Sequence, residues 1–164
     1  MSTLDLKAGY WQVEVAEEDR HKTAFTTPFR TFRFHRMHFG LKNSPTTFQR
    51  LMDHFRTGLS DVCVVAYLDD LLVVSDDVAS HVRDLRKVFD RLRMFDLKAN
   101  RDKCIFARNR GRYLSHVISS QGIQTDPEKV AAIVNMRSPS NLKSYVASFK
   151  LVVGSGNSFR NFTK

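Results

Sequence analysis

Cysteine, glycine and long apolar runs are all scarce in this sequence. Its 164 residues include 2 Cys, 7 Gly and 4 Pro. Cys63 and Cys104 lie far apart and outside any CxxC spacing, which disfavours a disulfide framework or a zinc site and predicts buried thiols in a reducing compartment. No apolar run reaches the ~18 residues that a membrane span needs, and no targeting signal is visible. We therefore expect a soluble, folded chain with no membrane partner.

Several catalytic signatures are absent as well. The sequence has no GxSxG and no HExxH motif, which disfavours the hydrolases that carry these motifs. It also has no Gly-rich phosphate loop, which disfavours P-loop enzymes. None of the 6 histidines forms an i, i+4 ligand pair. We expect these histidines on the surface or in the core rather than in catalysis.

Acidic residues are the minority among the charged ones. The chain has 26 Lys and Arg against 17 Asp and Glu, a net charge of +9. A positive surface potential favours a polyanionic partner, above all nucleic acid. Many basic proteins bind no specific acidic partner, so the charge alone leaves both alternatives open.

Hydrophobic periodicity predicts a mixed, α+β fold with one main core and a late lobe. Alternation or continuous apolar runs predict extended segments at residues 4–6, 11–15, 23–27, 31–37, 62–74 and 113–118. We expect residues 23–27 and 31–37 to form a hairpin with a loop, and residues 62–74 to form two strands joined by a turn, with the carboxylates Asp69 and Asp70 at its tip. Capping residues and apolar stripes predict helices that begin near residues 44, 80, 127 and 141. A turn is predicted at residues 119–122, where Gly122 can adopt a positive φ.

Two adjacent carboxylates, Asp69 and Asp70, interrupt the apolar run at residues 62–74. Buried like charges are unfavourable, so a cation is expected to compensate them. A simple acidic turn is the alternative, because Asp tolerates turn geometry and interrupts aggregation-prone strands. The turn contains no Gly, unlike most tight hairpins, which favours a functional role. Magnesium prefers carboxylate and phosphate oxygens, so Asp5 is the candidate third ligand of a two-ion site.

Four ordered blocks give a specific resemblance. They are LDLKAGY at residues 4–10, DRHKTAF at 19–25, FGLKNSP at 39–45 and YLDD at 67–70. The similarity continues through residues 97–104, 113–119 and 126–129. The chain resembles the reverse transcriptase, an RNA-directed DNA polymerase, of a gypsy-type long-terminal-repeat retrotransposon Pol polyprotein, and it looks like a truncated fragment of one.

The resemblance implies the palm of a right-hand polymerase, with an antiparallel sheet, flanking helices and the start of a helical thumb. We expect the palm over residues 1–119, with partial fingers strands at about 22–38. Residues 120–164 would form the connection to the thumb and the degraded thumb helices themselves, with residues 149–162 as the degraded thumb end. The family's other fingers strands precede its first Asp motif, so they are largely missing here, and we expect poor primer extension by this chain alone.

The family's functional residues carry over position by position. Its metal ligands fall on Asp5, Asp69 and Asp70 with the main-chain carbonyl of Leu6, and they imply two Mg²⁺ ions, with Mn²⁺ as a substitute. The nucleotide-binding positions are Tyr10, Phe39 and Gly40. The primer grip falls on Leu114, Ser115 and His116, where Ser115 replaces the usual glycine.

Tyr10 matches an aromatic gate that excludes a 2′-hydroxyl, although a core tyrosine is the alternative. A basic stretch precedes the primer grip and is well placed to contact phosphates, or else is a solvated loop. Its members are Lys98, Arg101, Lys103, Arg108, Arg110 and Arg112.

The function implied by the resemblance is the addition of deoxynucleotides to a primer 3′ end. The implied partners are an RNA template, RNA/DNA or DNA duplex, deoxynucleoside triphosphates and, in a dimer, other Pol chains. The implied location is a cytoplasmic virus-like particle or the nucleus. Two alternatives remain, a silent fragment that at most binds nucleic acid through its charge and a two-metal nuclease. Tyr10 and the block at residues 39–45 disfavour the nuclease.

Overall fold

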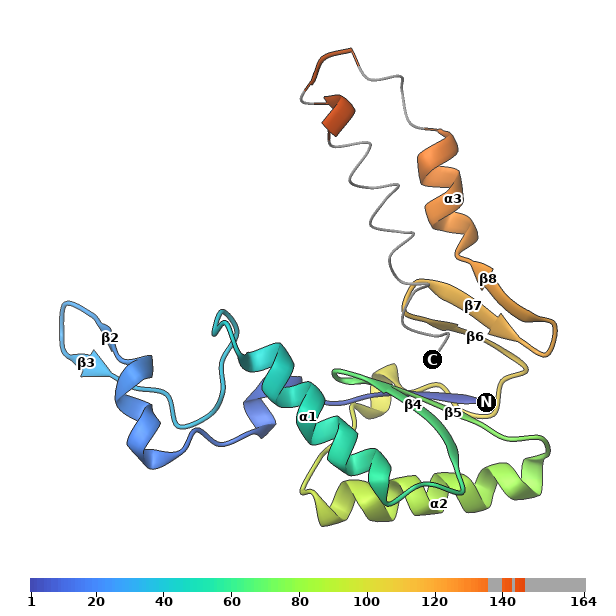
Figure 1. Ribbon diagram of the computed structural model, residues 1–164, viewed down its shortest axis with the longest axis horizontal. Helices are drawn as coiled ribbons and strands as arrows, with labels where there is room; N and C mark the ends of the chain where they lie inside the picture. Colours follow the sequence, from blue (N-terminus) through green and yellow to red (C-terminus); the bar gives the residue numbers. More distant parts are fainter. Residues whose placement is uncertain (136–139, 143, 147–164) are drawn as a thin grey trace. The chain divides into compact units, whose positions relative to one another are not determined.

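The computed structural model describes residues 1–135, 140–142 and 144–146. The chain divides into two compact units, Met1–Gly111 and Arg112–Lys164, whose elements are drawn in Figure 1. No described helix is long and apolar enough to cross a membrane. The predicted thumb segment at residues 149–162 lies outside the described residues, and the predicted palm boundary at residue 119 stays a prediction.

The first unit is built on a three-stranded antiparallel sheet of order β1-β5-β4. Its strands are β1 (Ser2–Asp5), β4 (Cys63–Tyr67) and β5 (Asp70–Val74). The central strand β5 is apolar on both faces, as the continuous run predicted, and Leu71 and Val73 are fully buried. Strands β4 and β5 pair from Cys63↔Val74 to Tyr67↔Asp70. The predicted hairpin with its carboxylates at the tip is therefore confirmed.

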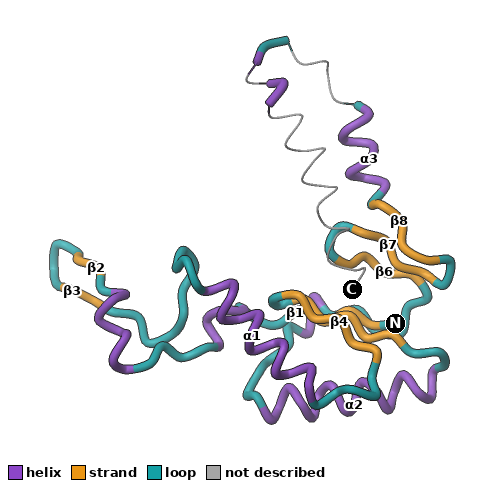
Figure 2. The backbone as a smooth tube through the Cα atoms, in the orientation of Figure 1, coloured by secondary structure: helices purple, strands orange, loops and turns teal. Residues whose placement is uncertain are grey.

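Two amphipathic helices pack on this sheet, α1 (Ser44–Thr57) against β4 and α2 (Val78–Met94) against β5 (Figure 2). Both helices were predicted. The side chain of Asp77 accepts a hydrogen bond from the backbone N of Ser80 and so caps α2. Each fully buried large apolar side chain contributes about 1.5–3 kcal/mol of transfer free energy. The helical residues of this core are Phe48, Met52, Phe55, Val88 and Leu92.

Arg91 ties the two helices together. From α2 its guanidinium donates hydrogen bonds of 3.1 Å to the main-chain carbonyls of His54 and Phe55, at the end of α1. These carbonyls are among those that an α-helix leaves unpaired at its C-terminus. A Cβ on Gly58 would lie 2.5 Å from Cζ of Arg91, so a larger residue there would have to displace the flexible end of the Arg91 side chain.

The segment between β1 and α1 differs from its prediction. The expected strand at residues 11–15 is wrong, because the 3₁₀ helix η1 (Gly9–Gln12) covers its first part. Only an isolated bridge, Glu14↔Arg36, remains beyond it. The alternation of apolar residues there reflects the packing of Val13 and Val15 against the core rather than a strand ladder.

A second 3₁₀ helix, η2 (Glu17–Thr23), leads into the short hairpin of β2 (Phe25–Thr26) and β3 (Thr31–Phe32). The hairpin was predicted, with longer strands. A third 3₁₀ helix, η3 (Arg101–Lys103), follows α2. Cys63 is exposed and Cys104 half-buried, and both are free. The prediction of two buried thiols is wrong for Cys63, which lies on the outer strand β4.

The strands β6 (Arg110–Tyr113), β7 (His116–Ser119) and β8 (Gly122–Thr125) form a second sheet, which α3 (Pro127–Val134) follows. The single strand predicted at residues 113–118 is wrong. Leu114 and Ser115 have φ values of 45° and 65° and turn the chain between β6 and β7. The predicted hairpin at residues 119–122 is confirmed, and Gly122 has the expected positive φ of 109°.

Candidate functional site

The carboxylates predicted as catalytic lie at one end of the first sheet. Asp5 is the last residue of β1 and Asp70 the first of β5, and the two are direct partners in the antiparallel register. Asp69 lies in the turn just before Asp70, and its carbonyl accepts a 2.8 Å hydrogen bond from the backbone N of Leu6. The register therefore brings together residues that are more than sixty positions apart in the sequence.

The turn that carries Asp69 is held in an uncommon conformation. Leu68 has a φ of 51°, which is unusual for a side chain that branches and contains no polar group. Its backbone N donates a 2.9 Å hydrogen bond to Oε1 of Gln49, on α1. A strained residue supported by its surroundings is a feature of functional sites. Gln49 was not among the predicted site residues, because nothing in the local sequence pattern links it to the turn.

The carboxylates repel one another. Partial burial is the largest cause that raises the pKa of Asp70, and the neighbouring charges of Asp69 and Asp5 raise it further. Lys103 opposes this shift, and its Nζ lies 3.4 Å from Oδ2 of Asp5. A compensating cation was predicted at these carboxylates, whereas Lys103 itself was predicted to contact the nucleic-acid backbone.

The donor set fits a hard divalent cation by its chemistry. Carboxylates that lie close together repel one another and are stabilised by a shared positive charge. The carbonyl of Leu6 accepts only a long, 3.4 Å hydrogen bond from the backbone N of Gly9. In residues 1–135, 140–142 and 144–146, however, no three His, Cys, Asp or Glu side chains are grouped closely enough to hold a metal ion.

Tyr10 lies on η1, between the core and the carboxylates. Its ring centroid is 5.5 Å from that of buried Phe48 and 5.3 Å from that of Phe39, whose side chain is 65% exposed. Burial and the charge of Asp69 raise the pKa of Tyr10. A Cβ on the adjacent Gly9 would lie 3.4 Å from the Asp69 carboxylate, which shows how closely η1 approaches it. The two alternatives for Tyr10, core residue and gate, both stay predictions.

Gly40 follows Phe39 and has a φ of 94°, a conformation that side chains disfavour. No atom lies within 4 Å of the position that a Cβ would occupy at Gly40. Glycine is required there by backbone conformation rather than by crowding.

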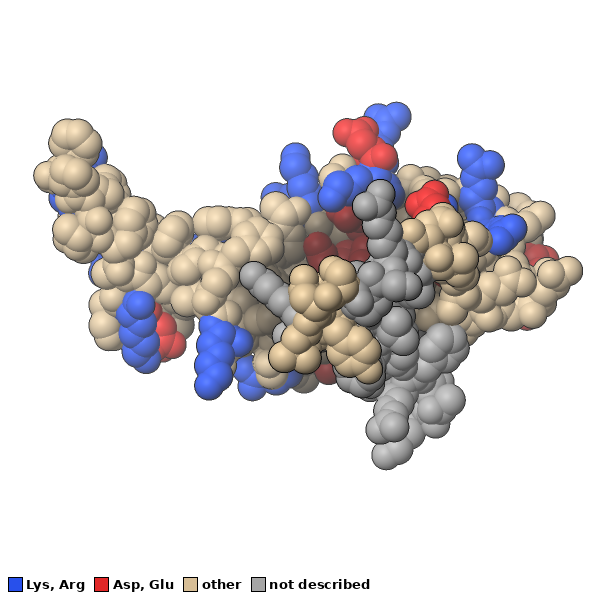
Figure 3. All heavy atoms as spheres, turned by 90° about the horizontal axis from the view of Figure 1, so that it is seen from above, with Lys and Arg blue, Asp and Glu red and all other residues tan. Residues whose placement is uncertain are grey.

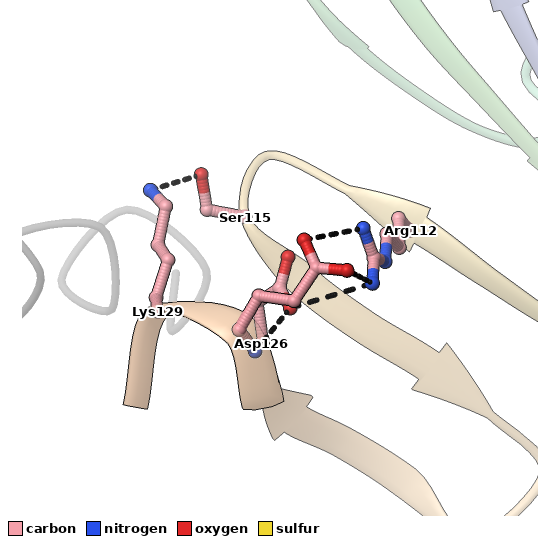
Figure 4. A network of polar contacts seen from close by, with 5 residues as sticks. Arg112, Ser115, Asp126 and Lys129 are labelled. Atoms are coloured by element: carbon pink, nitrogen blue, oxygen red, sulfur yellow. Dashed lines mark hydrogen bonds and ion pairs between the residues drawn. The ribbon is translucent and has the colours of Figure 1, made fainter. Parts of the chain in front are cut away.

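The predicted primer-grip residues lie in the second unit, at the turn between β6 and β7. Lys129 Nζ donates a 2.5 Å hydrogen bond to Oγ of Ser115, which ties the turn to α3 (Figure 4). Ser115 has the left-handed φ that explains a glycine in the family pattern. His116 is buried, and its Nδ1 lies 2.8 Å from the carbonyl oxygen of Leu114.

The predicted phosphate-contacting residues do not all present free charges. The guanidinium of Arg112 donates two hydrogen bonds, of 3.1 and 2.7 Å, to the carboxylate of Glu128. It also forms an ion pair of 3.8 Å with Asp126. In the first unit, Lys98, Arg101, Lys103, Arg108 and Arg110 are all exposed. Figure 3 shows Lys and Arg side chains (blue) projecting from the surface.

Comparison with known proteins agrees with this geometry. Residues 1–118 match the family described as "Reverse transcriptase (RNA-dependent DNA polymerase)". The retrovirus-related Pol polyprotein from transposon 297 of Drosophila melanogaster is 37% identical over 142 residues, 87% of this chain and 13% of that protein. The Pol polyprotein from transposon opus of the same organism is 37% identical over 162 residues, 98% of this chain and 16% of that protein.

Solved structures show the same fold. The foamy viral protease-reverse transcriptase in complex with double-stranded DNA matches with a TM-score of 0.86 and 25% identity, over 94% of this chain and 27% of that one. The same viral protein in complex with an RNA/DNA hybrid matches with a TM-score of 0.80 and 26% identity, over 92% of this chain and 20% of that one.

These findings define a partial polymerase fold of the α+β class. The chain belongs to the reverse transcriptase family, whose members are RNA-directed DNA polymerases, and it is a fragment related to retrotransposon Pol polyproteins. The predicted family and fold class are confirmed. The chain spans 13% and 16% of the two Drosophila relatives.

Proposed function

We propose that this chain carries the catalytic carboxylates of RNA-directed DNA synthesis, Asp5, Asp69 and Asp70. The observation that carries the proposal is the direct pairing of Asp5 with Asp70 at the end of β1 and β5, next to the turn that holds Asp69. Three carboxylates at one sheet end are unfavourable unless they share a cation. Membership of the reverse transcriptase family supports the proposal that this cation acts in phosphoryl transfer.

The proposed ligands are the three carboxylates and the carbonyl of Leu6. When bound, two Mg²⁺ ions, or Mn²⁺ in their place, would activate the primer oxygen and stabilise the leaving pyrophosphate. The chain's own residues would fix the positions of these ligands. The hydrogen bond from Leu6 to the carbonyl of Asp69 and that from Leu68 to Gln49 hold the turn.

The nucleotide would bind beside Tyr10, Phe39 and Gly40. A ring packed against the deoxyribose would leave no room for a 2′-hydroxyl and so favour deoxynucleotides. The proposed partners are an RNA template, RNA/DNA or DNA duplex, and deoxynucleoside triphosphates, with other Pol chains in a dimer. We propose that synthesis takes place in a cytoplasmic virus-like particle or in the nucleus.

Primer extension on an RNA template tests the proposal. We compare the 164-residue chain, the same chain joined to an upstream fingers segment, and Asp69→Asn in the joined protein. The joined protein should synthesise DNA in magnesium and the variant should not, because an amide lacks the charge that binds the ion. The chain alone should extend poorly, since cationic groups on the triphosphate also stabilise the transition state.

Asp76→Asn is the matched control, because Asp76 is an exposed carboxylate beyond the other end of β5. It should leave synthesis unchanged. Full synthesis by the Asp69→Asn variant would overturn the catalytic assignment. Nucleic-acid binding without synthesis by the joined protein would favour the alternative of a silent fragment.

A further inference from the structure

A chain of hydrogen bonds ties the start of β1 to the start of α2. His81, near the start of α2, is 5% exposed, and its Nε2 lies 2.7 Å from Oγ of Ser2, which is 1% exposed. Nδ1 of His81 lies 3.1 Å from Oγ of Ser75, and that hydroxyl donates a 2.5 Å hydrogen bond to Oδ2 of Asp84. We call these four residues the His81 network. It lies where the loop from β5 to α2 passes the start of β1 (Figure 1).

The hydrogen-bond partners of His81 fix its tautomer. An ionised carboxylate can only accept, so the Ser75 hydroxyl donates its proton to Asp84 and accepts from Nδ1–H of His81. Nε2 is then unprotonated and accepts the proton of Ser2 Oγ, which itself accepts a 3.0 Å hydrogen bond from the backbone N of Ala107. Burial, above all, and the N-terminal amino group lower the pKa of His81, although Asp84 raises it, and this favours the neutral ring.

The apolar pattern around β1 leaves the register of this strand ambiguous. Leu4 and Leu6 are both buried. A slip by one residue would turn them away from the core, but a slip by two would place Leu6 where Leu4 lies. Main-chain hydrogen bonds do not distinguish these two registers, because each residue of the strand has the same N–H and C=O groups. The slip by two would move Asp5 roughly 7 Å, from its place opposite Asp70 to one opposite Leu72.

The His81 network distinguishes the two registers. In the observed register Ser2 provides a donor for His81 and an acceptor for a backbone N–H. After a slip by two residues Leu4 would lie there, and its side chain offers neither. A buried polar group that loses its partner is left with its full desolvation penalty. The network therefore favours the register in which Asp5 lies opposite Asp70.

We propose that His81 is a positioning residue that holds β1, through Ser2, in the register that brings Asp5 to Asp70 and so assembles the candidate metal site. The other end of β1 is held separately, because the ring of Tyr10 on η1 packs against that of Phe48. Loss of the His81 network should therefore weaken the site rather than abolish it. The inference rests on the proposed function only for the role of Asp5 as a ligand.

Two measurements on the intact chain separate the register from metal binding. The first is the affinity for Mn²⁺, followed by electron paramagnetic resonance. The second is the nuclear Overhauser effect between the α protons of Asp5 and Asp70 in the metal-free chain. Leu6 donates a hydrogen bond to the carbonyl of Asp69, so the next pair, Asp5 and Asp70, is of the non-hydrogen-bonded kind, in which the main chains lie closer. This α-proton contact exists only in the observed register.

His81→Ala and Ser2→Ala break the network. Each should weaken Mn²⁺ binding about three- to tenfold, the range for one hydrogen bond, and should add an α-proton contact between Asp5 and Leu72. His81→Gln should largely restore both measurements, because its side-chain carbonyl can accept the Ser2 hydroxyl proton. The double variant should be no weaker than His81→Ala alone, since both substitutions break the same bond. Ser2→Ala removes a single atom, so it keeps the test valid where His81→Ala does not fold.

Val88→Ala is the matched control, because Val88 is fully buried on the same helix, about two turns beyond His81. It should lower the urea midpoint of unfolding but leave the Mn²⁺ affinity and the contact between Asp5 and Asp70 unchanged. A loss of Mn²⁺ affinity in Val88→Ala equal to that in His81→Ala, at an equal loss of stability, would show a structural role alone and overturn the proposal.

Unchanged Mn²⁺ affinity together with an unchanged α-proton contact in both His81→Ala and Ser2→Ala would also overturn it. The proposed function fails separately, if the unsubstituted chain binds no Mn²⁺. The α-proton contacts of Asp5 then still decide whether the His81 network sets the register.

Discussion

Replacement of Asp70 by Asn should stabilise the metal-free fold while removing a proposed ligand. Asp70 is half-buried and stands opposite Asp5, and burial and the charges of Asp69 and Asp5 raise its pKa above the usual 3.8. An acid with a raised pKa in the folded state destabilises the fold when it is ionised. The amide of Asn carries no charge and has nearly the same shape.

The magnitude follows from the register. Opposed residues on antiparallel strands lie about 5 Å apart. Two unit charges at about 5 Å repel by about 3 kcal/mol at an effective dielectric constant of 20 and by about 1 kcal/mol in water. Asp70 is partly exposed and Lys103 offsets some of the repulsion, so we expect a net gain of about 1 kcal/mol. That gain raises the melting temperature by roughly 2–4 °C for a chain of this size.

The gain should depend on pH in a definite direction. The contribution of Asp70 to stability is fully present below the pKa of the unfolded chain and is lost as the pH rises through the raised pKa of the folded chain. The advantage of the Asn variant should therefore be largest at pH 7 and should vanish in acid. Differential scanning calorimetry in EDTA at pH 7 and at lower pH measures it.

Asp90→Asn is the control for this prediction. Asp90 has a side chain that is 71% exposed and pairs with Arg93 at 2.8 Å, so its loss should change stability by less than about 0.5 kcal/mol. A melting temperature of Asp70→Asn below that of the unsubstituted chain at pH 7 would refute the reasoning. An advantage of equal size at all pH values would refute it too.

Three further substitutions test the packing and the site. Phe55→Ala should lower the free energy of unfolding by about 3–5 kcal/mol in urea denaturation, because the side chain is 0% exposed and leaves a cavity. Arg91→Ala should lower it by about 1–3 kcal/mol by removing hydrogen bonds to two carbonyls at the end of α1, of which that of His54 keeps its bond from the Thr57 hydroxyl, and Arg91→Lys should recover only part of this loss. Gly9→Ala should be tolerated, because its Cβ would lie 3.4 Å from Asp69. Gly9→Val should displace the Asp69 carboxylate and lower Mn²⁺ affinity while circular dichroism stays unchanged.

Local sequence patterns correctly predicted the helices and the hairpin that are specified by neighbouring residues. The helices α1 and α2 were recognised from capping residues and apolar stripes, and the β4–β5 hairpin from its continuous apolar run. The turn at Leu114 and Ser115 was missed, because neither residue ordinarily adopts a positive φ. The 3₁₀ helix at residues 9–12 was missed because alternation reports which side chains face the core and not which backbone groups are paired.

In the candidate site, too, some residues were predicted from local sequence and others were not. Asp5, Asp69 and Asp70 were predicted from residue type and motif, and the structure places them at one sheet end, while their metal-binding role stays a prediction. Gln49 and the contact between Lys103 and Asp5 could not be predicted from local sequence. These pairs join residues 19 and 98 positions apart, which only the folded chain brings together.

Titration with Mn²⁺ followed by electron paramagnetic resonance tests the central claim most directly, because it detects the metal site without requiring synthesis. The chain should bind Mn²⁺ in competition with Mg²⁺, and Asp5→Asn, Asp69→Asn and Asp70→Asn should each weaken binding at least tenfold. Asp76→Asn, at an exposed carboxylate outside the site, should bind as the unsubstituted chain does. Equal Mn²⁺ affinity in the three site variants and the control would contradict the assignment of these carboxylates as the metal ligands of a polymerase.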